Sequence, residues 1–392
     1  MGEIIRESTL NNLALECLIS PQLDSSLLKQ SVTGKAKHKS IEDFEIENDK
    51  LVIYYRNGKT SYCSKINLSE DSRNDVDRIR IRTSPDKVYK TILKSYKDPQ
   101  NSRNEEFWLK FFKGKFGTPR LIDSKKIGNI TVKQIEDKGG SFKEFLTSRS
   151  GSDPYHKNIA IEAYIQENFE EAIYLYQQMF KYMQKNRRYI EKNAPIKKTI
   201  DSEYCMQKFN PFVTDLITLG HEDIAQQLNN KKSYIADIIS AHSHYWIHGD
   251  YAPRNITHSY KNADMAVIDF ETVAKGHPVQ DMTSLLYSFE NGLQNNTHKD
   301  LMRTIFRTLC NVGIEVDTTR KLWQPCRALW NVRQAKGISS AIINGTSNDL
   351  NGICQRSEFR WYVDELSKAL KSIKQEDIDN FYSTNNKMAV GM

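Results

Sequence analysis

The sequence predicts an α+β protein whose strands gather in the N-terminal part and whose helices gather in the C-terminal part. Residues 44–136 contain several short β-prone runs, and two of these flank the RNGK sequence at 56–59. Asn-Gly between two such runs is the strongest short signal for a hairpin. From about residue 141, apolar side chains recur every three or four residues, which is typical of amphipathic helices.

Each predicted element rests on a local pattern. RIRIRT alternates and predicts a strand over 80–83, and KVYKTIL predicts the next strand over 87–93, after a Ser-Pro-Asp turn. The period then changes to that of a helix, which Gly114 to Pro119 ends. The remaining predictions are a helix over 102–113, strands near 120–123 and 129–136, a long helix through 165–183, helices at about 203–219, 221–242, 299–312, 318–343 and 358–374, and a β-prone island, MAVIDF, at 265–270.

These elements divide the chain into three expected parts. Residues 1–40 form a short helical arm and a basic linker, residues 41–138 form a β-rich domain, and residues 139–392 form a helical domain.

Composition excludes several classes of protein. The chain has 392 residues and a net charge of +7, from 56 Lys plus Arg against 49 Asp plus Glu, which is too mild an excess to favour nucleic-acid binding. No apolar run approaches the roughly 18 residues that a membrane span needs, and the N-terminus lacks the apolar core of a secretory signal. The six cysteines are scattered singly, as in a reduced protein. We therefore expect a cytoplasmic protein without a membrane span.

The segment YWIHGDYAPRNI contains the residues most suited to chemistry. Asn255 follows Asp250 by five residues, and Asp269 ends an apolar run fourteen residues further on. Phosphoryl transfer from a nucleotide needs a carboxylate that orients and deprotonates a hydroxyl, and hard oxygen ligands for Mg²⁺. Asp250 fits the first requirement, and Asn255 and Asp269 fit the second.

HGDYAPRN, followed by IDFE and GHPVQD, resembles the aminoglycoside phosphotransferase and choline kinase superfamily. Its members are small-molecule kinases with a bilobal, protein-kinase-like fold, so the resemblance implies a β-rich N-terminal lobe and a helical C-terminal lobe. It implies that Asp250 is the catalytic base and that Asn255 and Asp269 bind Mg²⁺. Asp281 resembles an acid that supports the loop, and His248 resembles a residue that shapes it.

The resemblance also implies a nucleotide site in the N-terminal part. Lys90, in the middle of a predicted strand, is similar to the lysine that binds the α- and β-phosphates of ATP or GTP. Glu106 resembles its ion-pair partner, with Glu105 as a close rival. Gln134, Ile135 and Glu136, ahead of two glycines, resemble the hinge that receives adenine. The segment expected to cover the nucleotide, SEDSRNDVD at 69–77, has no glycine, so the sequence does not choose between ATP and GTP as the nucleotide.

Other interpretations are weaker. The glycine-poor segment favours a nucleotide-binding pseudokinase or sensor, although Asp250, Asn255 and Asp269 are all present. A protein kinase is disfavoured, because few residues separate IDFE from GHPVQD and leave little room for peptide docking. A zinc site at His242, His244 and His248 lacks a further ligand downstream.

The acceptor is predicted only as a small hydroxylated metabolite or antibiotic, and the oligomeric state is not predicted. The basic net charge does not favour a polycationic substrate. A group of aromatic residues on predicted helices is assigned to the core, with a place in an acceptor pocket as the alternative. These residues are Trp323, Trp330, Trp361 and Tyr362.

Overall fold

The computed structural model describes the protein over residues 41–47, 50–55, 60–67, 75–84, 87–127, 130–141, 154–258, 265–288, 295–345 and 350–390. Within these ranges no helix combines the length and the apolar character needed to cross a membrane. The chain divides into two compact units. Unit 1 comprises Met1–Gly139 and His258–Glu271, and unit 2 comprises Gly140–Thr257 and Thr272–Met392.

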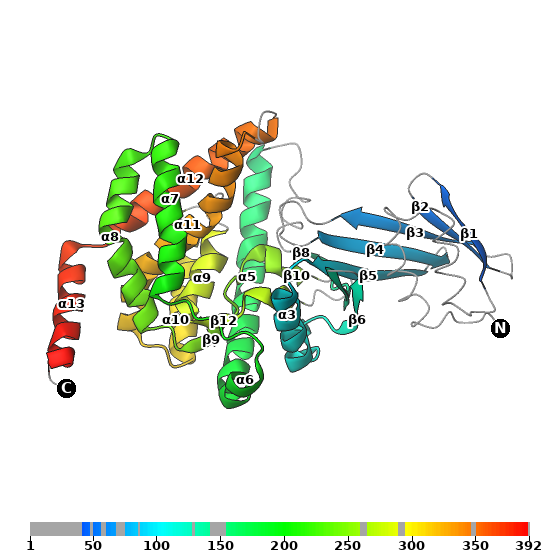
Figure 1. Ribbon diagram of the computed structural model, residues 1–392, viewed down its shortest axis with the longest axis horizontal. Helices are drawn as coiled ribbons and strands as arrows, with labels where there is room; N and C mark the ends of the chain where they lie inside the picture. The colour runs from blue at the N-terminus through cyan, green and yellow to red at the C-terminus, as the bar shows by residue number, and fades with distance from the viewer. Residues whose placement is uncertain are drawn as a thin grey trace. The chain divides into compact units, whose positions relative to one another are not determined.

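A seven-stranded sheet forms the frame of unit 1 (Figure 1), with the strand order β1-β2-β3-β4-β5-β7-β6. Neighbouring strands pair antiparallel, as expected for β-prone runs joined by short turns. β5 therefore lies between β4 and β7. The strands are β1 (Ile41–Glu47), β2 (Lys50–Tyr55), β3 (Thr60–Asn67), β4 (Asp75–Ser84), β5 (Lys87–Tyr96), β6 (Leu121–Ile127) and β7 (Ile130–Glu136).

Helix α3 (Pro99–Phe112) packs against β5, β6 and β7. It begins at the N-cap Asp98, whose carboxylate accepts a hydrogen bond of 2.8 Å from the Gln100 amide, and proline occupies the first helical position. Its apolar face includes the buried Trp108 and Phe112, and Leu93 of β5 is buried as well. α3 thus fixes acidic residues of its first two turns beside the end of β5.

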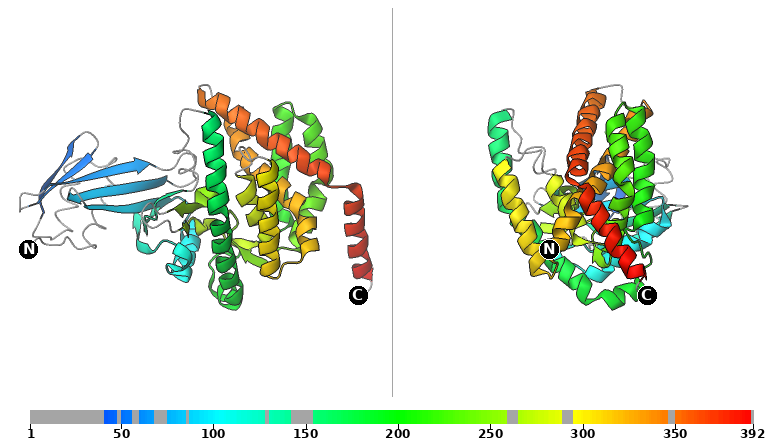
Figure 2. Two further views of the ribbon diagram at one scale, coloured as in Figure 1. Left: turned by 180° about the vertical axis from the view of Figure 1, so that it is seen from behind. Right: turned by 90° about the vertical axis from the view of Figure 1, so that its left-hand side faces the viewer.

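Unit 2 is built mainly of helices, with a short antiparallel pair formed by β9 (Tyr245–Ile247) and β12 (Ala274–Gly276). Figure 2 shows α7 and α8 side by side, and α11 packs against α7, α8, α9, α10 and α12. The helices are α5 (Pro154–Lys185), α6 (Arg187–Asn193), α7 (Ser202–Thr218), α8 (Glu222–Ala241), α9 (Pro278–Tyr287), α10 (Asn295–Asn311), α11 (Val316–Ile343), α12 (Leu350–Ser372) and α13 (Gln375–Val390).

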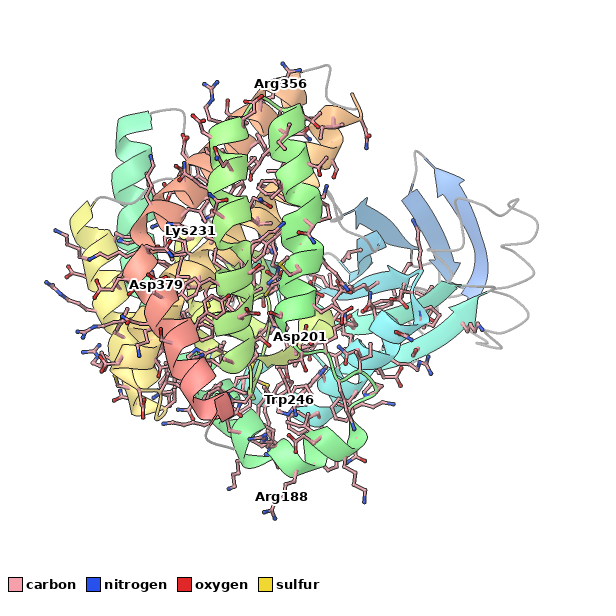
Figure 3. All side chains as sticks on the ribbon, turned by 60° about the vertical axis from the view of Figure 1, so that its left-hand side comes forward. Arg188, Asp201, Lys231, Trp246, Arg356 and Asp379 are labelled. Atoms are coloured by element: carbon pink, nitrogen blue, oxygen red, sulfur yellow. The ribbon has the colours of Figure 1, made fainter. Side chains whose placement is uncertain are left out.

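Polar contacts at helix ends complete the packing of unit 2. Lys231 of α8, labelled in Figure 3, donates hydrogen bonds of 2.6 Å to the carbonyl oxygens of Leu370 and Ile373 at the end of α12. Carbonyl oxygens in the last turn of a helix lack the usual partner four residues later, so the ammonium stabilises the end of the helix. Trp323 and Trp330 are buried on α11, as predicted for core residues, whereas Trp361 and Tyr362 are only partly buried.

The α+β class is confirmed, because the described strands of the N-terminal part form one sheet and the C-terminal part is mainly helical. One boundary differs from the prediction, since 258–271 groups with unit 1 and not with the helical part. Asp269 therefore belongs to the unit that contains the sheet. The predicted arm at 1–40, the turn at 56–59 and most of the glycine-poor segment at 69–77 lie outside the described residues.

Candidate active site

The loop from His248 to Asn255 follows β9 in unit 2 and requires glycine at its second position. Gly249 has φ of +82°, a left-handed conformation that residues with a side chain rarely adopt. A Cβ atom there would lie 2.3 Å from the carbonyl oxygen of Thr272. The glycine in HGD therefore allows a close approach of two backbone segments, and the Thr272 hydroxyl bonds the His248 carbonyl oxygen at 3.1 Å.

Asp281 supports the same loop through its main chain. It lies in the first turn of α9 and is fully buried, and its two carboxylate oxygens accept hydrogen bonds of 2.8 Å from the amides of His248 and Gly249. His248 is also fully buried. These contacts are those expected of a loop-supporting acid and a loop-shaping histidine. They fix the start of the segment that presents Asp250.

Asp250 is held by two neighbours from the same loop. The Arg254 guanidinium donates from Nη2 to Oδ1 at 2.7 Å and to Oδ2 at 2.8 Å. Burial acts to raise the pKa of Asp250, but Arg254 and then Arg333 outweigh it and lower that pKa below its usual range. The carboxylate is therefore ionised at neutral pH. Arg333, on α11, is placed beside it by a hydrogen bond of 2.9 Å to the Gly249 carbonyl oxygen.

Asn255 is oriented by Asp250. Its Nδ2 atom donates to the main-chain oxygen and to Oδ2 of Asp250, both at 2.9 Å. Because both bonds use the nitrogen, the amide carbonyl oxygen is the atom that Asn255 can offer to a cation. The motif spacing of five residues thus brings the two predicted residues into direct contact.

In unit 1 a buried lysine is surrounded by carboxylates. The Nζ atom of Lys94, on β5, lies 2.6 Å from Oδ1 of Asp269, 3.1 Å from Oε2 of Glu105 and 3.8 Å from Oε2 of Glu271. Burial by itself lowers the pKa of Lys94, but the three carboxylates, Asp269 first, raise it well above its usual range. Burial raises the pKa of Glu105, and although Lys94 lowers it, the neighbouring charges of Asp269 and Glu271 raise it further.

The predicted pair of Lys90 and Glu106 does not form. Lys90 is exposed, because the pairing of β7 with β5 begins at Thr91 and leaves Lys90 beyond the end of β7. Glu106 instead meets Lys110 at 2.6 Å and Lys133 at 3.5 Å. Lys94 and Glu105 form an ion pair between β5 and α3. The apolar run that ends in Lys94, ILK, resembles the V-A-I-K pattern of a phosphate-binding lysine and could have identified it.

The predicted hinge residues lie inside the sheet. Gln134 and Ile135 belong to β7 and pair with β5 on one side and β6 on the other. Glu136 pairs with Thr91 of β5, and its amide donates to the Arg120 carbonyl oxygen at 3.0 Å. The main chain of 134–136 is therefore engaged in sheet contacts. The non-regular segment begins after Glu136, at 137–139.

The acidic side chains of unit 1 have the donor atoms that Mg²⁺ prefers. Among the described residues, one group of at least three His, Cys, Asp or Glu side chains has ligand atoms within 4.8 Å of one another, and it consists of Glu105, Asp269 and Glu271. Carboxylate oxygens suit a hard cation. Asp269 has φ of +63°, a left-handed backbone that aspartate tolerates better than most residues. The alternative zinc site is not supported, since His242, His244 and His248 form no such group in the described parts of the chain.

Sequence comparison identifies one family. Residues 220–308 match the model of the phosphotransferase enzyme family, APH. The matched segment includes the loop from His248 to Asn255, Asp269 and Asp281, and it excludes Lys94 and Glu105. A comparison with curated proteins gives no match.

Solved structures of similar architecture share little sequence with the chain. An ethanolamine kinase of Plasmodium vivax has 11% identity and a TM-score of 0.48, covering 94% of this chain and 96% of that one. A choline/ethanolamine kinase family protein of Mesorhizobium loti has 15% identity and a TM-score of 0.45, covering 77% and 87%. An aminoglycoside phosphotransferase of Alicyclobacillus acidocaldarius has 11% identity and a TM-score of 0.43, covering 86% and 93%. With all three TM-scores below 0.5, function is argued from the family match and the site residues.

The family match covers the segment in which the HGD loop, Asp269 and Asp281 were singled out from the sequence. Residues 220–308 therefore match a phosphotransferase family, and the resemblance to the superfamily of aminoglycoside phosphotransferases and choline kinases is confirmed over this segment.

Proposed function

We propose that this protein transfers the γ-phosphoryl group of ATP or GTP, with Mg²⁺, to a hydroxyl group of a small molecule. In this proposal the chain has the bilobal, protein-kinase-like fold, with residues 41–138 as the β-rich lobe, 139–392 as the helical lobe and 1–40 as an arm. The acceptor is a hydroxylated metabolite or an antibiotic. Because ATP and GTP are nucleotides of the cytoplasm, the reaction is assigned to that compartment.

The roles in unit 1 follow its contacts. Lys94 takes the place first assigned to Lys90 and would bind the α- and β-phosphates, and Glu105 takes the place of Glu106 and would orient it. The hinge that receives adenine would be 137–139, since 134–136 has its main chain engaged in the sheet. Asp269 in unit 1 and Asn255 in unit 2 are the residues proposed as Mg²⁺ ligands. When bound, Mg²⁺ neutralises phosphate charge as the reaction proceeds.

Asp250 would orient the acceptor hydroxyl and take up its proton. His248 and Asp281 would keep the loop in place without contacting substrate, as their main-chain contacts indicate. The observation that supports the proposal best is the geometry of this loop. An ionised aspartate, hydrogen-bonded to an asparagine five residues later, lies within the segment that matches a phosphotransferase family.

The first test is release of ADP or GDP with Mg²⁺ and each nucleotide, over a panel of aminoglycosides, amino alcohols, sugars and hydroxy acids. The wild-type protein should release diphosphate in the presence of its acceptor, and Asp250→Asn should not. Nucleotide affinity, measured by calorimetric titration, should be nearly the same in both proteins, because Asp250 is assigned to the acceptor. Equal loss of turnover and nucleotide affinity would contradict the role of Asp250.

The same assay distinguishes the alternatives. A protein that binds Mg–nucleotide but phosphorylates neither a small-molecule acceptor, nor casein, nor itself would be a pseudokinase or sensor. Phosphate incorporated into casein alone would indicate a protein kinase. Absence of nucleotide binding would overturn the kinase proposal altogether.

A further inference from the structure

Arg254 covers the carboxylate to which the proposed function assigns the acceptor proton. It lies next to Asn255 in the short helix η3 (Pro253–Asn255), and its side chain is 41% exposed, against 10% for Asp250. One nitrogen, Nη2, contacts both oxygens of Asp250. The solvent side of the proposed base is thus occupied by a guanidinium that belongs to the same loop.

The two oxygens of Asp250 have different partners. Oδ2 accepts from Asn255 as well as from Arg254, whereas the hydrogen bond found for Oδ1 comes from Arg254. A hydroxyl that gives its proton to Oδ1 competes with Arg254 for that oxygen. The side chain of Arg254 is partly exposed and can move away from Asp250 towards solvent. The buried Asn255 would stay bonded to Oδ2.

Arg254 also faces the surface formed by α11 and α12, which belongs to unit 2. Its Nη1 atom lies 3.5 Å from Oε1 of Gln334 on α11. Burial and then Glu358 raise the pKa of Tyr362 on α12, and the charge of Arg254 acts in the opposite direction. The ring of Tyr362 packs against Trp361 at 4.8 Å between centroids. We call Gln334, Trp361 and Tyr362 the α11–α12 wall.

Two buried acids, of α12 and α7, already have cationic partners. The acids Glu365 and Asp215 are paired, the first with Arg327 and Lys368 and the second with Lys336. Glu358 is exposed and accepts the Tyr362 hydroxyl at 3.3 Å. Beside Asp250 itself, two guanidinium groups, Arg254 and Arg333, face one carboxylate.

A guanidinium leaves one carboxylate most readily for another planar anion, because carboxylates and phosphates match its donor geometry. We propose that Arg254 is the acceptor-recognition residue: it leaves Asp250 to bind a carboxylate or phosphate group of a hydroxylated organic anion, which packs against the α11–α12 wall. Its departure uncovers Oδ1. The acceptor hydroxyl then gives its proton to Oδ1, its oxygen bonds to the γ-phosphorus, and the bond to the β-phosphate breaks to release the nucleoside diphosphate.

This inference rests on the proposed function, and matched acceptor pairs test it. Each pair differs by an anionic group: glycerate and glycerol, gluconate and glucitol, glycerol 1-phosphate and glycerol. Equilibrium binding of each compound to the Mg–ADP-saturated protein is measured by calorimetry or ligand-observed NMR, and turnover is measured separately. The proteins are wild type, Arg254→Gln, Arg254→Lys and the control Arg356→Gln, whose exposed arginine projects from α12 (Figure 3).

The wild-type protein and Arg356→Gln should bind at least one anionic member about tenfold or more tightly than its neutral partner, as a charge-assisted pair predicts. Arg254→Gln should reduce this preference to within about threefold by weakening the anion, with nucleotide affinity unchanged, and Arg254→Lys should restore part of it.

Two results would overturn the inference. One is an equal affinity for anionic and neutral members across all pairs in the wild-type protein. The other is an Arg254→Gln variant that loses nucleotide affinity and keeps its acceptor preference, which would assign Arg254 to the donor phosphate. Failure of the proposed function gives a different pattern: no turnover with any compound of the wider panel, whatever the binding preference.

Discussion

The two units surround their candidate reactive groups with opposite charge. In unit 1 the ammonium of Lys94 lies within 3.8 Å of three carboxylates. In unit 2 the carboxylate of Asp250 is bonded by Arg254 through both oxygens, and Arg333 is fixed next to it on Gly249. The first cluster has one cation among three carboxylates, whereas in the second one carboxylate lies next to two guanidinium groups, with the buried Asp281 bonded to the same loop.

This difference separates two kinds of ligand. A cluster of carboxylates around one lysine favours a divalent cation, and it holds the lysine in place until phosphate groups compete for it. A carboxylate with two guanidinium groups stays ionised, and it becomes accessible when an anion draws one guanidinium away. The predictions below change one cluster at a time and give each change a matched control.

The largest effect is expected from Lys94→Met compared with Lys90→Met. Loss of Lys94 should reduce turnover by about 100-fold or more, since it removes a cation from the phosphates. It should also lower the free energy of unfolding by about 3–5 kcal/mol, because Glu105 would stay buried without its partner. Lys90→Met should change both quantities little, as Lys90 is exposed. Steady-state kinetics and urea unfolding measure the two effects.

A second substitution separates stability from function at this site. Adding Glu105→Leu to Lys94→Met removes the unpaired carboxylate and should recover much of the lost stability without recovering activity. Recovery of both, or equal behaviour of Lys90→Met and Lys94→Met, would contradict the role assigned to Lys94.

A smaller effect is expected from Gly249→Ala compared with Gly313→Ala. Both glycines have φ above +80°, so each alanine bears the left-handed penalty of about 1–2 kcal/mol. A Cβ at Gly313 meets nothing within 4 Å, whereas a Cβ at Gly249 would collide with Thr272. Urea unfolding should therefore show at least about twice the destabilisation for Gly249→Ala. Similar values for the two variants would show that the close approach to Thr272 adds no measurable destabilisation.

The comparison of Glu105→Gln with Glu106→Gln tests which acid serves Lys94. Glutamine at 105 keeps the shape of the side chain but removes the charge that meets Lys94 at 3.1 Å. The turnover rate at saturating nucleotide should fall by about tenfold, which is a typical loss for one charge-assisted contact. Glu106→Gln should stay within about threefold, since its partners are Lys110 and Lys133. The reverse ranking in kinetic assays would restore the sequence-based choice of Glu106.

The smallest effect concerns pH and the cap of α9. Burial, with His242 and His244 nearby, lowers the pKa of His277 to about 3. The unfolded chain takes up a proton near pH 6.5 and the folded chain does not, so stability should fall as pH drops from about 6.5 towards 3, by at most about 1.4 kcal/mol per pH unit for this group.

His277→Asn removes this titration and keeps a side chain that can accept the hydrogen bond His277 now receives from the Val279 amide at 3.3 Å. Urea unfolding at pH 7.5, 6.5 and 5.5 should show a shallower loss of stability in His277→Asn than in the wild-type protein. Parallel curves would mean that the imidazole is protonated in the folded state.

The two clusters differ in how far the sequence predicts them. Asp250 and Asn255 were both identified, because their contact is made within one short loop, where spacing nearly fixes geometry. Glycine at 249 belongs to the HGD motif, and the physical reason for it, the carbonyl oxygen of Thr272, comes from a distant residue. Arg254 lies in the same motif, but the spacing of the motif does not predict its contact with Asp250.

In unit 1 the sequence determined the strand and its face but not the position along it. Lys90 and Lys94 are four residues apart and so share one face of β5. Only the tertiary structure decides between them, because burial depends on where β7 begins to pair. Adjacent acids of α3 pose the same problem, since a helical pattern does not say which of Glu105 and Glu106 meets a lysine from another strand.

The sequence by itself determined the class of fold, the loop from His248 to Asn255 and the resemblance of residues 220–308 to a phosphotransferase family, because all of these are properties of short segments. The ion pair between Lys94 and Glu105, its contact with Asp269 and the support of Gly249 by Thr272 were decided by the tertiary structure. Each joins residues that are distant in sequence or on separate elements, and such contacts depend on strand register and on where neighbouring elements end.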